Sequence, residues 1–249
     1  MKGFLLLLSF MTRIPMPKTE YDEEKLGKSM KYFPVVGIIV GFILLFFCII
    51  FNFIFKNLNY STALPLMILV VILTDLITTG ALHLDGLADT FDGLFSYAKK
   101  EKMLEIMKDS RIGTNGTVVL ILYFITKITI ISEIITINPK YLIIFPIIAR
   151  LSTSVNAGLS DYARKSGMSN AIISENGIFE VIFSLILTNA LVFLIIGTKG
   201  GIALFIALLF IILFMFNVRK KIGGITGDTM GASLELTSIL VLFLGIILR

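Results

Sequence analysis

The stretch HLDGLADTFDG, residues 83 to 93, gathers three aspartates beside the only histidine of the chain. If residues 84 to 95 form a helix, Asp85, Asp89 and Asp92 are spaced i, i+4 and i+7 and share one face. Three like charges repel one another, and near a membrane they also lose hydration. A divalent cation removes both costs, and oxygen ligands without cysteine favour Mg²⁺ or Mn²⁺. The spacing therefore predicts a metal site, with a solvated acidic helix end as the alternative.

A second acidic position lies in the glycine-rich stretch GGITGDTMGA, residues 223 to 232. Backbone N–H groups at such a helix start suit phosphate, so Gly227 is a candidate phosphate contact. Asp228 is a candidate metal ligand, although its carboxylate could instead cap the helix. Glu235 lies seven residues further on the same face, inside an apolar run where a carboxylate is costly and usually functional. Two acidic helices facing each other would make a two-metal site or a metal site with a base.

Basic residues near glycines are candidates for holding phosphate. Lys108 and Arg111 stand just before the glycine turn of MKDSRIGTNGT, residues 107 to 117. Arg13 in TRIPMP and Arg164 in DYARKSG are further candidates. For all four, an ordinary membrane-anchoring charge is the alternative.

His83 is a candidate base, phosphate contact or metal ligand, although a lone histidine is more often a packed polar residue. Inside the apolar runs, Asp75 and Lys127 would form a structural ion pair, and Arg150 needs a partner or a ligand.

The elements that position these residues are membrane helices. The 249 residues are 56% hydrophobic and 16% charged, whereas a soluble domain carries roughly a quarter charged residues. The sequence predicts an all-α, polytopic integral membrane helical bundle, in which residues 1–249 form a single membrane-embedded catalytic domain. Its N-terminal segment GFLLLLSFM is expected to be a short re-entrant or interfacial helix that helps to cover the site. The seven expected transmembrane helices are Val35–Phe55, Ala63–Leu82, Thr117–Ile137, Tyr141–Val155, Ile178–Ile196, Ile202–Asn217 and Ala232–Leu248.

The distribution of Lys and Arg predicts the orientation in the cell membrane. Alternate connecting segments, beginning with the one before the first span, hold sixteen of these residues, and the opposite side holds four. Because basic residues gather on the cytoplasmic side, the N-terminus is expected inside and the C-terminus outside. The same rule explains the net charge of +5 without nucleic acid as a partner. Every polar motif falls on the cytoplasmic side, so the active site is expected there.

These residues together favour metal-assisted phosphoryl transfer. They offer carboxylates for a metal and cations for phosphate, but no evident covalent nucleophile. The single cysteine, Cys48, allows neither an internal disulfide nor a cysteine-based metal site.

Four strings, HLDGLADTFDG, EIMKDSRIGTNG, FPVVGIIVG and GGITGDTMGA, together with an early TRIPMP, resemble one family over nearly the whole chain. It is the adenosylcobinamide-GDP ribazoletransferase family, also called cobalamin-5′-phosphate synthase. The resemblance implies a membrane enzyme of the nucleotide-loop step in cobalamin biosynthesis. Adenosylcobinamide-GDP and α-ribazole, or α-ribazole 5′-phosphate, would give adenosylcobalamin, or its 5′-phosphate, and GMP. The oligomeric state stays open, a homo-oligomer included.

The resemblance also implies roles for individual residues. The ribazole 5′ oxygen would attack the pyrophosphate while Mg²⁺, or Mn²⁺, neutralises it. The metal would be held by Asp85, Asp89, Asp92 and Asp228, and phosphate oxygens by Lys108 and Arg111. Asp89 or Asp92 would take the hydroxyl proton.

Two other functions share part of this residue set. The DGLAD…D pattern partly matches the aspartate motif of CDP-alcohol phosphotransferases, but Asp89 replaces that motif's arginine and its later aspartate pair is missing. A divalent-cation transporter would place acidic residues near the middle of the membrane and use paired broken helices. In this chain the acidic cluster lies at one membrane face.

Overall fold

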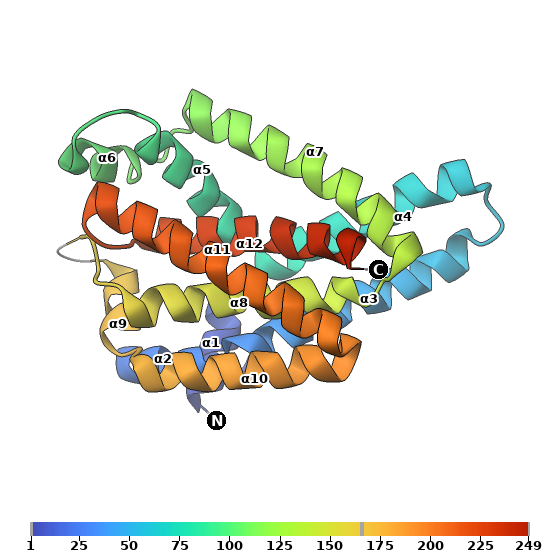
Figure 1. Ribbon diagram of the computed structural model, residues 1–249, viewed down its shortest axis with the longest axis horizontal. Helices are drawn as coiled ribbons and strands as arrows, with labels where there is room; N and C mark the ends of the chain where they lie inside the picture. The colour runs from blue at the N-terminus through green and yellow to red at the C-terminus, as the bar shows by residue number, and fades with distance from the viewer. Residues whose placement is uncertain (1, 165–166, 249) are drawn as a thin grey trace.

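The computed structural model describes residues 2–164 and 167–248, which form α-helices, one 3₁₀-helix and no strand (Figure 1). The predicted all-α fold is therefore confirmed. In chain order the elements are α1 (Lys2–Met11), α2 (Glu23–Lys28), the 3₁₀-helix η1 (Ser29–Tyr32), α3 (Phe33–Phe55), α4 (Tyr60–Thr79), α5 (Leu82–Leu94), α6 (Lys100–Ile106), α7 (Thr114–Ile137), α8 (Tyr141–Leu159), α9 (Met168–Ser174), α10 (Ile178–Ile196), α11 (Thr198–Ile222) and α12 (Gly227–Ile247).

Seven helices in the described part of the chain are long and apolar enough to cross a membrane: α3, α4, α7, α8, α10, α11 and α12. Their number agrees with the sequence prediction, and the chain is a multi-pass membrane protein. Several bounds differ, because hydropathy does not detect the polar turns at helix ends. Thus α12 begins at Gly227 rather than at Ala232, and α11 extends to Ile222 rather than to Asn217.

The expected second span ends earlier than predicted. Gly80 and Ala81 both have a positive φ, of 65° and 56°, which ends α4 and separates it from α5. The Gly80 N–H donates to the Leu76 carbonyl and closes the last turn of α4. The chain then changes direction and begins α5, the helix that carries the three aspartates.

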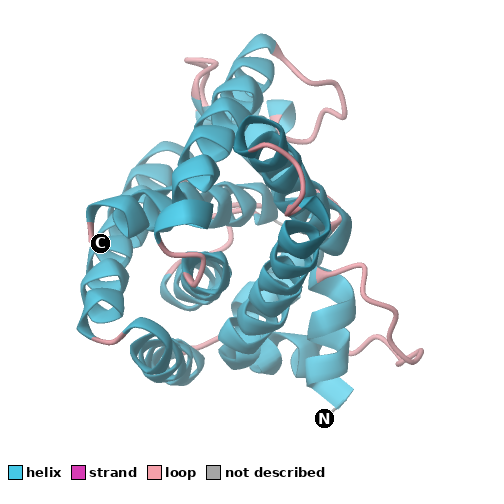
Figure 2. Ribbon diagram, turned by 90° about the vertical axis from the view of Figure 1, so that its right-hand side faces the viewer, coloured by secondary structure: helices cyan, strands magenta, loops and turns pink. Residues whose placement is uncertain are grey.

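The centre of the bundle is α8, whose residues 141–157 are all buried. The spans α3, α10, α11 and α12 pack against it, and Figure 2 views the bundle roughly along its helices. The backbone of α3 at Gly37 lies directly against α8. A Cβ atom at Gly37 would be only 2.5 Å from the Pro146 carbonyl oxygen. Small residues at such a crossing let two membrane helices approach closely.

The outer faces of the spans are apolar and exposed. Phe46 of α3, Ile125 of α7, Ile186 of α10 and Phe205 of α11 are more than half exposed. A surface of this kind suits lipid rather than water.

The short helices α6 and α9 lie at one end of the bundle, opposite the C-terminus (Figure 1). The first turn of α12 is at that same end. There Thr226 caps α12 by accepting a hydrogen bond from the Thr229 N–H. The segments that carry Lys108, Arg164 and Asp228 therefore lie at one end of the bundle.

Candidate functional site

The aspartate-bearing helix α5 packs tightly against α12. A Cβ atom at Gly86 would lie 2.7 Å from the carbonyl oxygen of Asp228 and 3.0 Å from its Cα atom. Only glycine fits at this crossing. The close approach brings Asp228 into the electrostatic neighbourhood of Asp85 and Asp89, so the two acidic helices face each other as predicted.

Asp89 shows how strongly these carboxylates interact. Burial, followed by the negative charges of Asp85, Asp228 and Asp92, raises the pKa of Asp89 to about 7, and the positive charge of Arg164 opposes the shift. A carboxylate among like charges is stabilised by a bound cation. The donor set therefore suits a divalent cation.

The described residues do not form a complete metal site: no group of three or more His, Cys, Asp or Glu side chains is arranged to hold an ion. This agrees with the habits of Mg²⁺, which usually takes one or two protein carboxylates, several waters and the phosphates of a substrate. The carboxylates of α5 and α12 fit that kind of shared coordination.

Asp228 and Arg164 form an ion pair at 2.7 Å, and both side chains are largely buried. Backbone bonds fix the segment that carries Arg164: the Ala163 N–H donates to the Ile225 carbonyl, and the Ile225 N–H donates to the Asp161 carbonyl. The candidate phosphate ligand Arg164 and the candidate metal ligand Asp228 are thus brought together, each neutralising the other.

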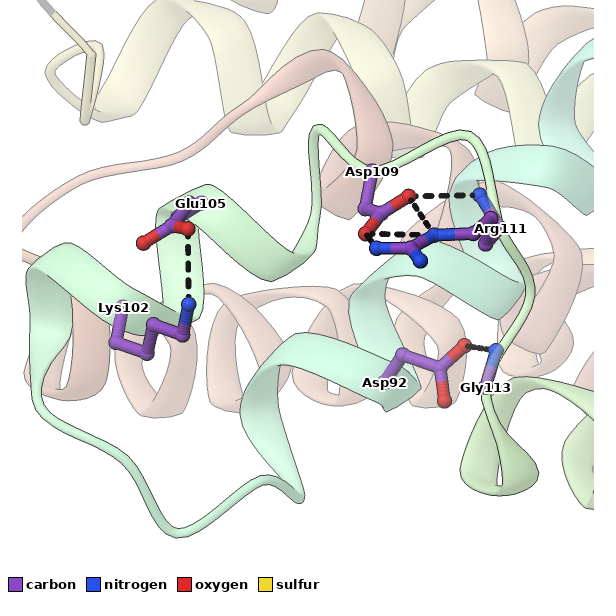
Figure 3. Close-up of polar contacts among 6 residues, drawn as sticks. All are labelled: Asp92, Lys102, Glu105, Asp109, Arg111 and Gly113. Carbon is purple, nitrogen blue, oxygen red and sulfur yellow. Dashed lines mark hydrogen bonds and ion pairs between the residues drawn. The ribbon is translucent and has the colours of Figure 1, made fainter.

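Asp92 has partners of its own. One carboxylate oxygen accepts a hydrogen bond of 2.7 Å from the Gly113 N–H (Figure 3), and the other accepts one of 2.8 Å from the Gly116 N–H. These donors begin α7, so Asp92 caps a neighbouring helix. The glycine turn that follows the candidate cations Lys108 and Arg111 thus holds a side chain of the protein itself. A role for Asp92 as a metal ligand or base stays a prediction.

Two of the four candidate phosphate-binding cations have contacts outside the α5–α12 crossing. Arg111 is exposed and pairs with its neighbour Asp109 at 2.6 Å (Figure 3). Arg13 lies against Gly80, and its backbone N–H donates to the Thr78 carbonyl.

A cavity of about 370 Å³ opens beside α5 and α12. Phe10 and Met11 form part of its wall, so the N-terminal helix borders the site as expected; no observation tests whether that helix is re-entrant or interfacial. The lining includes six of the predicted site residues, His83, Asp85, Lys108, Arg164, Gly227 and Asp228. It also includes residues that the sequence did not single out, Thr153, Tyr162, Ile172 and Met230 among them. Their types are common in any membrane helix, so no sequence signal distinguishes them.

A second groove, also of about 370 Å³, is bordered by Asp85 and Asp89 together with Ser110 and Ile112. Asp85 therefore lines both spaces.

His83 is 5% exposed, and its Nε2 atom has no hydrogen-bond partner among the described residues. Burial and the nearby positive charge of Arg150 lower the pKa of His83 to about 3. The imidazole is therefore neutral at physiological pH, when it can donate from one nitrogen and accept at the other.

Glu235 does not join this site. It accepts a hydrogen bond from the Tyr123 hydroxyl, which in turn accepts one of 2.6 Å from Lys127. The predicted ion pair between Lys127 and Asp75 is confirmed at 2.7 Å. The expectation of a metal site shared by Asp228 and Glu235 is therefore wrong, because these hydrogen bonds hold the Glu235 carboxylate in a buried cluster with Tyr123, Lys127 and Asp75.

Comparison with known proteins gives a consistent result. A family model described as "Cobalamin-5-phosphate synthase" matches residues 3–246. The adenosylcobinamide-GDP ribazoletransferase of Fusobacterium nucleatum subsp. nucleatum is 55% identical over 273 aligned residues, which cover 100% of this chain and 98% of that protein. Proteins of the same name from Clostridium novyi and Clostridioides difficile are 37% and 36% identical and cover 96% and 97% of this chain, and 94% and 96% of their own lengths. No solved structure matches the chain.

Proposed function

The chain belongs to the cobalamin-5-phosphate synthase family, and we propose that α5 and α12 carry its phosphoryl-transfer centre. The enzyme is an adenosylcobinamide-GDP ribazoletransferase of cobalamin biosynthesis, and its reaction releases GMP. Family membership decides against the two alternatives, a CDP-alcohol-type phosphotransferase and a divalent-cation transporter. The observation that carries the site proposal is the close crossing of the two helices at Gly86 and Asp228, which places Asp85 and Asp228 in the wall of one cavity. The raised pKa of Asp89 is a consequence of this crowding of carboxylates.

In this proposal Asp85, Asp89 and Asp228 hold Mg²⁺, or Mn²⁺, jointly with the pyrophosphate of adenosylcobinamide-GDP. When bound, the cation withdraws charge from the phosphoryl oxygens. Lys108 and Arg164, at the edge of the same cavity, hold phosphate oxygens. Arg164 can do so only by sharing its guanidinium between Asp228 and the substrate.

The attacking oxygen is not the 5′ oxygen that the family resemblance implies, for a chemical reason. The family is named for a product that carries a 5-phosphate. When the ribazole 5′ oxygen already carries that phosphate, it cannot attack, so the nucleophile is a secondary hydroxyl of the ribose. A new bond forms between this oxygen and the phosphorus next to the cobinamide arm, and the bond from that phosphorus to GMP breaks with its electron pair. We assign the hydroxyl proton to Asp89, since both oxygens of Asp92 already accept hydrogen bonds.

The sidedness follows from the sixteen basic residues on one side and four on the other. We place the N-terminus and the site in the cytoplasm, and the C-terminus outside. Both substrates would then reach the cavity from the cytoplasm.

The test is a product assay with purified protein in lipid. Adenosylcobinamide-GDP, α-ribazole or its 5′-phosphate, and Mg²⁺ should give equimolar GMP and cobalamin product, and EDTA should stop the reaction. Asp89→Asn should reduce kcat by at least about a hundredfold, while the protein stays folded in the membrane. Asp109→Asn is the matched control, because Asp109 borders neither the cavity nor the groove that Asp89 borders and instead pairs with Arg111. Full activity of Asp89→Asn would refute the site proposal.

A further inference from the structure

The cavity beside α5 and α12 has two kinds of wall. Asp85, Asp228, Lys108 and Arg164 make part of it charged. Apolar side chains form another part: Phe10 and Met11 of α1, Leu82 of α5, Ile172 of α9 and Met230 of α12. The uncharged polar residues His83, Thr153, Tyr162 and Ser169 also line the cavity. A space that combines apolar side chains with convergent polar groups is typical of a small-molecule site.

Three buried polar atoms on residues that line this cavity have no partner among the described residues: His83 Nε2, Thr153 Oγ1 and Arg164 Nε. The Arg164 guanidinium is already paired with Asp228 through another nitrogen. His83 and Thr153, which are 5% and 4% exposed, have no such pair. Buried polar groups in folded proteins are nearly always hydrogen-bonded, so these two orphan groups on one cavity point to a ligand. The His83 nitrogen donates or accepts one hydrogen bond, depending on tautomer, and the Thr153 hydroxyl can both donate and accept.

We propose that this cavity binds the ribazole substrate, an inference that rests on the proposed function. Its flat base lies against the apolar wall, and its free ring nitrogen bonds to Thr153 or His83. The ribose then extends toward Asp85 and Asp228, where a ribose hydroxyl meets the phosphoryl group. A 5′-phosphate on the ribose falls within reach of the cations at the cavity edge, Lys108 and Arg164.

The other components of the reaction fit this cavity less well. A guanine base presents the N7 and O6 acceptors and an N2 amino donor, and the side chains of Phe10, Met11, Leu82, Ile172 and Met230 offer these atoms no partner where a flat base would lie. A benzimidazole nucleoside keeps one free ring nitrogen and otherwise offers apolar surface. The corrin ring of the other substrate is far too large, since about 370 Å³ lies near the lower limit of ligand pockets.

The first test uses the single histidine of the chain. Protein without a histidine tag, labelled with ¹⁵N only at histidine, gives imidazole signals from His83 alone. Titration with α-ribazole should shift these signals, whereas GMP at the same concentration should leave them unchanged. Shifts with GMP, or no shift with α-ribazole at concentrations that saturate turnover, would overturn the proposal. Because binding is read without turnover, a failure of the proposed function appears separately, as absence of cobalamin product from the unmodified protein.

The second test removes one orphan group. Thr153→Val keeps the side-chain shape and should raise the KM for α-ribazole by about five- to tenfold. The KM for adenosylcobinamide-GDP should stay within about twofold. The matched control is Thr188→Val, since Thr188 is equally buried with an unpartnered hydroxyl but does not line the cavity. An equal rise in both KM values, or the same effect from the control, would show a structural role for Thr153 and refute the proposal.

Discussion

Aspartates in this chain differ in role because their surroundings differ. Asp92 is satisfied by two backbone N–H groups, and Asp75 is paired with Lys127. Asp89 has no such compensation and lies among like charges, which raises its pKa to about 7. The repulsion that destabilises the ionised Asp89 carboxylate in the free protein is relieved when a cation binds, so the same crowding favours cation binding.

A pH dependence of metal binding follows from this shift. Below about pH 7 Asp89 is mostly protonated, and a cation favours the deprotonated form, so Mg²⁺ binding must displace a proton. The dissociation constant for Mg²⁺ should therefore rise about eightfold as the pH falls from about 7.5 to about 6. Calorimetric titration of the purified protein at each pH measures this. In Asp89→Asn most of the dependence should vanish, and an unchanged slope in that variant would exclude Asp89 as its source.

At the scale of elements, one carboxylate connects α5 to α7. Two bonds to Asp92, from the Gly113 N–H (Figure 3) and from the Gly116 N–H, fix the start of α7 and the loop before it. Bonds to a charged acceptor contribute more than neutral ones, about 1.5–3 kcal/mol each. The glycine motif is thus explained by a contact within the chain.

Replacing Asp92 tests this positioning role. Asp92→Asn keeps one acceptor and turns an amide toward the other N–H, so α7 should loosen at its start. Hydrogen exchange at the Gly113 and Gly116 amides should accelerate by at least about tenfold. The Mg²⁺ concentration for half-maximal binding should stay within about twofold. A large rise in that concentration with unchanged exchange would instead make Asp92 a metal ligand.

Periodicity predicted the elements better than it predicted their contacts. The i, i+4, i+7 spacing correctly placed the three aspartates on one helix, and apolar runs located all seven spans. The spacing could not show that Asp92 faces the start of α7. Spacing determines which side of a helix a residue lies on, but not which other element packs against that side. For the same reason Glu235 was assigned to the wrong cluster, and Thr153 was not noticed. The break at Gly80 and Ala81 depends on backbone conformation that a hydropathy profile does not record.

At the scale of the whole molecule, a buried polar cluster joins spans that are distant in sequence. Asp75 of α4, Lys127 and Tyr123 of α7 and Glu235 of α12 form one chain of hydrogen bonds. In a bilayer such groups are costly unless paired, so the chain specifies how these helices assemble.

Breaking the cluster should destabilise the protein more than it alters the site. Lys127→Met leaves the Asp75 carboxylate buried without its cation, a change that costs about 3–5 kcal/mol. Thermal unfolding of the purified protein should show a clear fall in Tm. The double variant Asp75→Asn, Lys127→Met should recover most of the loss, because no unpaired charge remains. Equal stability of the single and double variants would mean that the ion pair contributes little.

The distribution of basic residues predicts how the whole bundle is oriented in the membrane, with the N-terminus inside and the C-terminus outside. Replacing Cys48 by serine leaves no cysteine, so single cysteines can then be introduced at exposed positions on opposite sides of the membrane. Asn57→Cys lies between α3 and α4, and Glu101→Cys lies on α6. If basic residues mark the cytoplasmic side, a membrane-impermeant maleimide added to intact spheroplasts should label Asn57→Cys at once and Glu101→Cys only after permeabilisation. Both must react in detergent as a control for accessibility. The reverse pattern would put the cavity on the outer face, and the substrates would then have to reach it from outside the cell.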